Sequence, residues 1–444
     1  MRLRGTAPAL LGIVLLVAAC GGDDGDAADV VPDDAAPAAG EDDHDHDDDD
    51  DHDDHDHDDD HDDAGGLGAV EVNAAAYRLL VADGEAGQVT VLDTDTGEVL
   101  DTIEIPAPQD APTMLATSDD GRYGFAVMYD RDAVQVIDSG VWTVDHGDHS
   151  HYYVAPPASL ALHEGDSPAH VVAHDDYTAI FFDGDGQYRM LTAADLAQRA
   201  EGELLDADAP HHGVAVPWDE GSAIVSEYGD TEPDQSTLPP EVVVRDAEGE
   251  VVESGFPECP ELHGEASAGH TVAFACADGI LVLEEHGDHF DGHKLDYPDG
   301  DGRSGTLRGA AGLEVLVGNY DEDTMLVIEP EEHTVTPLEL PASFSTFAVT
   351  AHGDGSLLGV SADGSLHVVD LEAGSATSID GVVAEYSADA TWTDPTPQLA
   401  VGPDALVYVS DPGAGQVHEV DLDAGSVVRS FDVEGMPFHV AVAG

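Results

Sequence analysis

The chain has 444 residues, and its 95 aspartates and glutamates against 12 lysines and arginines give a formal net charge of −83. Most of these carboxylates lie beyond residue 63, so the acidic stretch near the N-terminus does not account for the charge alone. A surface of this charge repels nucleic acid and anionic lipid and attracts cations, so we expect no nucleic-acid partner. Adaptation to a salty habitat is an alternative source of the acidity, but it leaves the histidines unexplained.

The first twenty residues, MRLRGTAPALLGIVLLVAAC, carry two arginines before an apolar run that is too short to span a bilayer stably. This pattern indicates an export signal rather than a transmembrane helix. Small residues precede Cys20 and GGDDGD follows it, which resembles the lipobox of bacterial lipoproteins. We expect residues 1–20 to be a lipoprotein signal peptide and Cys20 to be lipidated, so that the protein is extracytoplasmic and lipid-anchored to the cell membrane. Ordinary signal-peptidase cleavage is the alternative.

Residues 21–68 have almost no aromatic or β-branched side chains and cannot bury enough apolar surface to offset the loss of chain entropy. We predict a disordered Asp/His-rich tether. Its segment 41–63, EDDHDHDDDDDHDDHDHDDDHDD, consists of carboxylates and six histidines, and we interpret it as a weak, fast-exchanging metal collector because aspartates are hard ligands. The histidines of this collector are His44, His46, His52, His55, His57 and His61.

From residue 77 onward, short apolar runs alternate with Gly-, Asp- and Pro-rich turns, which is typical of strands joined by tight connections. Similar units recur, each after an inner strand that begins near residue 114, 170, 213, 264, 307, 347 or 398. This period is typical of four-stranded propeller blades. We predict an all-β fold in which residues 69–444 form a single β-propeller, closed by pairing of the C-terminal strand FHVAVAG with the N-terminal unit. Eight blades are expected, with seven as the alternative; two β-sandwich domains fit the period less well. The stretch 192–205 is predicted to be helical.

Cys259 and Cys276 are the cysteines that remain after Cys20, and a pair in an exported protein is most simply a disulfide. A cysteine-based zinc site is the rival, although two thiolates lack the paired spacing of a zinc knuckle.

Four predicted inner strands begin with a histidine in the same phase: His170, His212, His263 and His439. Equivalent positions on different blades lie at one level around a propeller axis, so these imidazoles should converge into a set that suits zinc. His174 follows His170 by an even strand offset and is included, whereas His211 should point away from His212.

Two connections share the element His-Gly-Asp-His, in which the glycine lets the chain fold back so that both imidazoles face one ion. The first contains His146, His149 and His151, and the second, a possible second metal site, contains His286, His289 and His293. Polar surface loops are the alternative for both. The remaining scattered histidines are taken as structural or surface residues: His163, His270, His333, His352, His367 and His418.

The fold pattern and the stretches DHGDHSHYY, HVVAHDDYTAIFFDGDG, PHHGVAVP, CPELHGEAS and VAFACADGILVL together resemble the AztD family of extracytoplasmic zinc metallochaperones. The resemblance covers most of the chain from about residue 70 onward. It implies a β-propeller that binds Zn²⁺ tightly through its histidines, helped by a flexible His- and acid-rich N-terminal segment, and that passes the ion to the solute-binding protein of a zinc ABC importer. Which histidine group forms the tight site stays open at this point.

We therefore expect a carrier that binds zinc without transforming it, and not an enzyme. The sequence has no nucleophile elbow, metalloprotease helix or nucleotide-binding fingerprint in a strand-to-helix context. A propeller enzyme of the lactonase or quinoprotein type with an axial metal is one rival, but such calcium sites favour oxygen ligands. A protein-interaction scaffold, in which the central histidines are structural, is the other. Copper and nickel also bind such ligands, so the sequence does not identify the metal directly.

Overall fold

The computed structural model describes residues 68–444 apart from 234–237, 288, 301 and 392. The predicted signal peptide with Cys20, the tether up to residue 67 and the six histidines of the collector lie outside the described residues. Within the described part of the chain, no helix is long and apolar enough to cross a membrane.

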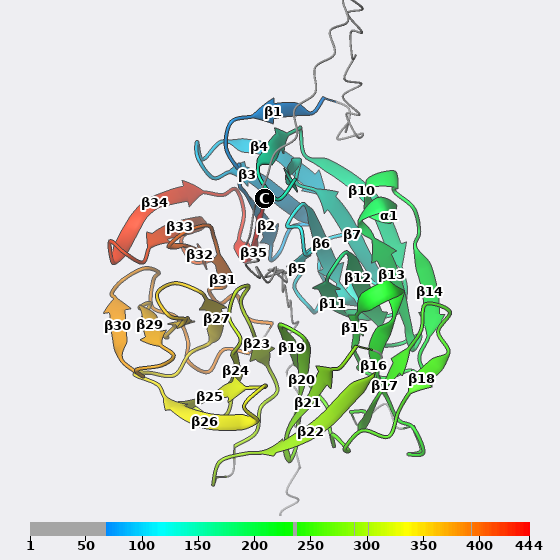
Figure 1. The fold of residues 1–444 in the computed structure, drawn as a ribbon. Coiled ribbons are helices and arrows are strands. Elements are labelled where there is room, and N and C mark those ends of the chain that lie inside the picture. Colours follow the sequence, from blue (N-terminus) through cyan, green and yellow to red (C-terminus); the bar gives the residue numbers. More distant parts are fainter. Residues whose placement is uncertain (1–67, 234–237, 288, 301, 392) are drawn as a thin grey trace, which may run out of the picture.

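Eight four-stranded antiparallel sheets are arranged in succession around a common centre (Figure 1). The first sheet combines the last strand of the chain, β35 (Pro437–Ala443), with β2 (Arg78–Asp83), β3 (Gln88–Asp93) and β4 (Val99–Glu104). The next four sheets follow in chain order and consist of β5 (Met114–Thr117), β6 (Tyr123–Met128), β7 (Ala133–Asp138) and β10 (Ala158–Glu164); β11 (Pro168–His174), β12 (Tyr177–Phe182), β13 (Gln187–Thr192) and β14 (Glu203–Asp206); β15 (Ala215–Pro217), β16 (Ala223–Glu227), β17 (Glu241–Arg245) and β18 (Val251–Glu253); and β19 (Glu265–Ala268), β20 (Thr271–Cys276), β21 (Gly279–Glu285) and β22 (Phe290–Asp296). The last three consist of β23 (Leu307–Arg308), β24 (Leu316–Asn319), β25 (Thr324–Glu329) and β26 (Thr334–Glu339); β27 (Thr346–Thr350), β28 (Ser356–Val360), β29 (Leu366–Asp370) and β30 (Ala376–Ile379); and β31 (Leu399–Val401), β32 (Leu406–Asp411), β33 (Gln416–Asp421) and β34 (Ser426–Asp432).

The predicted inner strands are all present, and the first residue of each lies within two positions of its expected start. The predicted pairing of the last strand with the first unit is also present: β35 pairs antiparallel with β2, with Leu80 opposite Ala441. The first and last parts of the chain therefore share one sheet.

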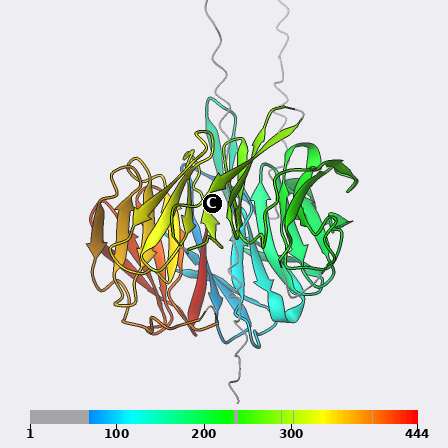
Figure 2. The same cartoon turned by 90° about the horizontal axis from the view of Figure 1, so that it is seen from below.

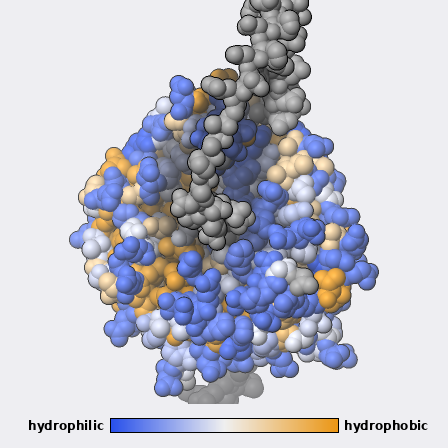
Figure 3. Space-filling model, viewed as in Figure 1, coloured by the Kyte–Doolittle hydropathy of each residue, from blue (hydrophilic) through white to orange (hydrophobic). Residues whose placement is uncertain are grey.

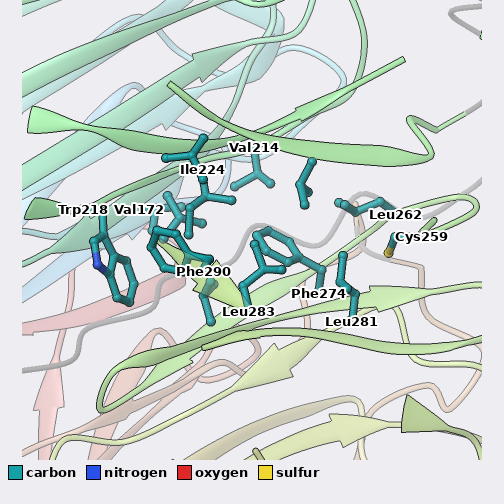
Figure 4. Packing of buried hydrophobic residues seen from close by; sticks show 14 of the residues in the cluster. Val172, Val214, Trp218, Ile224, Cys259, Leu262, Phe274, Leu281, Leu283 and Phe290 are labelled. Carbon is teal, nitrogen blue, oxygen red and sulfur yellow. The ribbon is translucent and has the colours of Figure 1, made fainter. Parts of the chain in front are cut away.

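The core lies between the sheets rather than within one central mass. Eight clusters of buried apolar side chains each join sheets that are neighbours in chain order, and one of them joins the β31–β34 sheet to the sheet of β35 and β2. Figure 4 shows one cluster, in which Val214 and Ile224 pack with Phe274 and Leu283 of the next sheet. Because clusters lie on both sides of a sheet, its second strand is buried on both faces. All six residues of β20 are buried, whereas a strand with one face in solvent would have alternating buried and exposed residues.

A small additional sheet projects from this body. It has the order β1 (Val70–Val72), β9 (Ser150–Val154) and β8 (Val141–Asp145). The β8–β9 hairpin is inserted between the third and fourth strands of its neighbouring sheet. Figure 2 shows the β8–β9 hairpin and the long β21–β22 hairpin extending on the same side of the molecule.

The predicted helix over 192–205 is only half correct. Helix α1 covers Ala193–Gln198, begins with a capping box between Thr192 and Asp195, and ends where Arg199 takes a left-handed conformation. The following residues form β14, which pairs with β13 as the outer strand of its sheet. Although the composition of this stretch favours a helix, pairing with β13 makes its last residues a strand. Short 3₁₀ turns cover Tyr129–Arg131 and Asp219–Gly221.

The predicted disulfide is present: Cys259 and Cys276 are bonded, and both are fully buried. The bond attaches the loop before β19 to the end of β20 in the same sheet. On the outside, the face seen in Figure 3 is mostly hydrophilic, and its apolar residues lie in separate patches.

Candidate metal centre

Three of the four histidines predicted to share one level lie close together, on or just before the inner strands of successive sheets. His170 lies on β11, and His212 and His263 lie in the loops just before β15 and β19, which are the inner strands of successive sheets in Figure 1. The Nε2 atoms of His170 and His212 are 3.4 Å apart. The ring centroid of His263 lies 5.2 Å from that of His212 and 6.4 Å from that of His170. We call these three residues the axial cluster.

Each ring of the axial cluster has its Nδ1 atom near an oxygen atom, at hydrogen-bond distance in His212 and His263 and at a longer, ion-pair distance in His170. His212 Nδ1 lies 2.7 Å from Asp183 Oδ2, and His170 Nδ1 lies 3.5 Å from Glu265 Oε1. His263 Nδ1 donates to the Gly305 carbonyl oxygen at 2.6 Å. Because a carbonyl oxygen only accepts, the Nε2 atom of neutral His263 carries a lone pair. Acceptors on the distal ring nitrogens are the arrangement that orients histidines for metal binding.

Burial and neighbouring charges shift the pKa values of His263 and His170 in opposite directions. Burial lowers the pKa of His263 to about 3, with a further contribution from its neighbours His212 and His170. Burial also opposes protonation of His170, but the Glu265 carboxylate outweighs it and raises the pKa of His170. Two Nε2 atoms 3.4 Å apart need either one proton or one cation between them, so a metal ion that binds there would replace that proton.

His263 Nε2 is the atom that shows how well the cluster suits a cation. It is buried and has no hydrogen-bond partner among the described residues. A buried polar atom without a partner costs about 1–3 kcal/mol. A borderline cation such as Zn²⁺ accepts neutral imidazole lone pairs, so an ion held by His170, His212 and His263 would remove this cost and leave one position open for a further ligand.

His439, the fourth histidine of the predicted level, is held in a different way. The Leu115 backbone N–H donates to His439 Nδ1 at 3.2 Å, so the proton of the neutral ring is on Nε2. Burial lowers the pKa of His439 to about 4, and the nearby Arg308 charge adds to this. In this tautomer neither ring nitrogen has a free lone pair, so we leave His439 out of the axial cluster.

His174 and His211 also lie apart from the axial cluster. His174 is four residues along β11 from His170, about 13 Å away, and stacks on Trp218 with ring centroids 4.3 Å apart. His211 does point away from the cluster as predicted: it is buried, with Nδ1 2.6 Å from the Ala209 carbonyl oxygen and Nε2 3.1 Å from Ser226 Oγ.

The β8–β9 hairpin gathers the first group of loop histidines at the surface. The rings of His146, His149 and His151 have centroids 4.9–5.2 Å apart. Gly147 has φ of 81°, and the His146 N–H donates to the His149 carbonyl oxygen at 2.9 Å, which closes the turn. The shared element therefore folds back as predicted.

Carboxylates support two of these hairpin histidines. Asp148 Oδ1 lies 2.7 Å from His149 Nδ1, and Glu71 Oε1 on β1 lies 2.6 Å from His151 Nδ1. The hydrogen bond from His149 lowers the pKa of Asp148. The pairing of β1 with β9, which brings Glu71 opposite Tyr153, is a long-range contact that the sequence did not reveal. The hairpin cluster of His146, His149 and His151 is thus an exposed counterpart of the buried axial cluster.

The second loop group divides into two parts. His286 and His289 have ring centroids 5.8 Å apart at the β21–β22 turn, which is closed by the same backbone hydrogen bond as the first hairpin. His293 instead lies beside His333, with ring centroids 4.0 Å apart, and near Glu284. His333 was taken as a structural or surface residue; its turn is 40 positions further along the chain, and no local pattern marked it.

Two of the remaining scattered histidines are buried beside hydroxyl groups, whereas buried His163 has no hydrogen-bond partner at either ring nitrogen among the described residues. His367 Nε2 lies 2.8 Å from Ser361 Oγ, and His418 Nδ1 lies 2.8 Å from Ser430 Oγ. A hydroxyl partner of this kind satisfies one ring nitrogen of a core histidine without a metal.

Comparison with known proteins decides the family. The chain is 30% identical over 377 residues to the zinc chaperone AztD of Citrobacter koseri, covering 84% of this chain and 87% of that protein. The chain belongs to the AztD family. The crystal structure of Citrobacter koseri AztD matches the fold with a TM-score of 0.76 over 84% of this chain and 98% of that one, and apo AztD from the same organism matches at 29% identity with a TM-score of 0.75 over 84% and 99%.

Outside the AztD family the likeness is one of fold alone. The dihydro-heme d1 dehydrogenase NirN is 14% identical and matches with a TM-score of 0.52 over 82% of this chain and 74% of that one. No family model matches the chain. The AztD relative is named as a zinc chaperone rather than an enzyme, which agrees with the expectation that this chain is not an enzyme.

Proposed function

We propose that this chain is a zinc chaperone whose tight site is the axial cluster of His170, His212 and His263. The observation that carries the proposal is the buried, unpartnered His263 Nε2 beside two imidazoles whose distal nitrogens face carboxylates. Three histidines with oriented tautomers form a donor set for Zn²⁺, and oxygen-seeking ions such as Ca²⁺ fit it poorly. The zinc chaperone role of the AztD relative supports this assignment.

The hairpin cluster of His146, His149 and His151 would bind zinc at the surface and exchange it more readily, because its ligands are exposed and can leave one at a time. In the same proposal, the histidines of the tail collector raise the local zinc concentration. Cys20 anchors the chain to the membrane outside the cytoplasm. The exceptionally acidic composition of the whole chain favours the approach of cations.

The proposed recipient is the solute-binding protein of a zinc ABC importer. Transfer would proceed by ligand exchange, in which an acceptor ligand enters the position that three histidines leave open before the first histidine departs. A site of this kind releases zinc to a partner more easily than a closed site of four thiolates.

We further propose that the eight sheets are the blades of a closed propeller. The pairing of β35 with β2 and the apolar cluster between the β31–β34 sheet and the β2 sheet support closure. Truncation before Pro437 would remove one strand of the first sheet, and we expect this truncation to abolish cooperative unfolding. A truncated chain that unfolds like the full-length protein would argue against closure.

Zinc affinity of the full chain tests the site, and zinc delivery tests the role. The double variant His170→Ala/His263→Ala should lose its tightest zinc ion while remaining folded, whereas His352→Ala, a lone histidine on another sheet, should retain it. Unchanged tight binding in the double variant would refute the axial site. If the loaded chain transfers zinc to the solute-binding protein no faster than zinc dissociates spontaneously, the chaperone role fails.

A further inference from the structure

The outer part of the β19–β22 sheet meets a turn of the next sheet at a second group of metal-binding side chains. Glu284 on β21, His293 on β22 and His333 in the turn between β25 and β26 place one ligand atom each within 4.8 Å of one another. The two imidazoles have ring centroids 4.0 Å apart, and His333 Nε2 lies 3.6 Å from Glu284 Oε2. We call these residues the rim cluster.

The register of the β21–β22 hairpin explains why Glu284 and His293 lie on one face. Glu284 is directly opposite Asp291, and His293 follows Asp291 by two positions, so all three side chains leave the hairpin on the same side. His286 joins them from the turn, with Nε2 3.7 Å from Glu284 Oε1 and 3.7 Å from Asp291 Oδ2. The hairpin thus presents imidazoles alternating with carboxylates.

His333 reaches this face from the neighbouring sheet because of an unusual backbone conformation. Its φ is 52°, in the left-handed region that residues other than glycine seldom adopt, and its N–H donates to the Pro330 carbonyl oxygen at 3.1 Å. Left-handed residues outside glycine cluster at functional positions, where the surrounding structure holds them.

We propose that Glu284, His293 and His333 bind a Zn²⁺ ion that joins the two neighbouring sheets. Two imidazoles and one carboxylate are a donor set that Zn²⁺ accepts, and three protein ligands leave a position for water or an incoming ligand. The side chains of Glu284 and His333 are 27% and 38% exposed, so the ion exchanges with solvent. His286 and Asp291 surround Glu284 and add negative charge and a further imidazole nearby.

The rim site is separate from the axial site and does not depend on the chaperone role. Its ligands come from two sheets, so its ion would attach the β21–β22 hairpin, with His286 and His289 at its turn, to the turn beside β26. An ion that binds only the folded chain stabilises it in proportion to its concentration relative to the dissociation constant. The rim site should therefore appear both in zinc stoichiometry and in thermal stability.

The full chain and its variants test the proposal in a chelator-buffered zinc series, with bound zinc measured by elemental analysis and unfolding measured by thermal melts. His333→Asn removes the imidazole while retaining a residue that tolerates the left-handed conformation, and Glu284→Gln removes the carboxylate charge without touching that turn. Both variants should bind the rim ion at least about 100-fold more weakly and lose the zinc-dependent rise in melting temperature that belongs to it. His352→Ala, which removes a partly buried histidine from another sheet, should behave like the unaltered chain.

Combining these variants separates the two sites. In the His170→Ala/His263→Ala background, His333→Asn should remove one further ion per chain. Equal stoichiometry and equal melting shifts with and without His333→Asn, in both backgrounds, would overturn the rim site whatever the axial result. Loss of an ion with His333→Asn but not with the axial double variant would support the rim site and refute the proposed axial site.

Discussion

Asp183 is the position at which the axial site can be tested most finely, because it touches the cluster without being one of its ligands. Its Oδ2 atom lies 2.7 Å from His212 Nδ1, and its side chain is almost fully buried. In Asp183→Asn, the amide oxygen can still accept from His212, so the tautomer is kept and only the charge is lost. In Asp183→Ala, the acceptor is lost as well.

Loss of a carboxylate behind a metal-binding histidine weakens metal affinity by about 10–100-fold, or about 1.4–2.7 kcal/mol. We expect Asp183→Asn to lie near the lower limit, since it keeps an acceptor, and Asp183→Ala to lie near the upper limit. Asp206→Asn is the matched control: it removes the same charge from the same sheet at an exposed position, where Asp206 accepts from the Gln187 amide at 2.7 Å.

Competition with a chromophoric zinc chelator at fixed pH measures these affinities, and the chelator should be strong enough to strip loosely bound ions from the tail. Two results would refute the reasoning. One is an unchanged dissociation constant in both Asp183 variants. The other is an equal loss in Asp206→Asn, which would mean that general negative charge, rather than support of His212, sets the affinity.

Three further predictions concern protons, the disulfide and a stacked ring. Because the pKa of His170 lies above its ordinary value, protons compete with zinc for this proposed ligand, so apparent zinc affinity should fall by up to about tenfold per pH unit as pH drops through neutrality; competition titrations that show no pH dependence contradict this. Replacing Cys259 and Cys276 by serine should lower the free energy of unfolding by about 3 kcal/mol, measured with urea, given their separation of 17 residues. His174→Phe should change the fluorescence of Trp218, on which His174 stacks, and leave zinc affinity unaltered; a tenfold loss would restore His174 to the ligand set.

The parts of the fold that repeat along the chain could be predicted from sequence. The period of the inner strands located each of them within two residues, and the shared phase of His170, His212 and His263 correctly brought these three together. Both signals are local patterns that the propeller-like arrangement copies from sheet to sheet. The strand that follows α1 could not be predicted in this way, because β14 is stabilised by its pairing with β13 and not by its own composition.

The choice among histidines of equal phase depends on partners that are remote in sequence. His439 occupies the expected phase, but the backbone N–H of Leu115, on an adjacent sheet, donates to its Nδ1 atom and thereby places the ring proton on Nε2. No metal-binding residues flank His333 in a recognisable sequence motif. It became a candidate ligand only because its left-handed backbone conformation brings it next to His293 of another sheet. Tautomers and contacts between sheets depend on the tertiary structure, so they could not be predicted from a local sequence pattern.

The direction of the strands places the axial cluster and the hairpin histidines at opposite ends of the molecule. His170, His212 and His263 lie at or before the beginnings of inner strands, whereas the β8–β9 and β21–β22 hairpins lie at connections between third and fourth strands, which antiparallel alternation puts at the opposite end. An inner strand of seven residues such as β11 spans about 23 Å, so an acceptor protein docked on a hairpin would not reach an ion held by the axial cluster. In the proposed chaperone, zinc would therefore enter and leave the axial site at one end of the molecule, and the hairpin histidines would bind zinc independently at the other end.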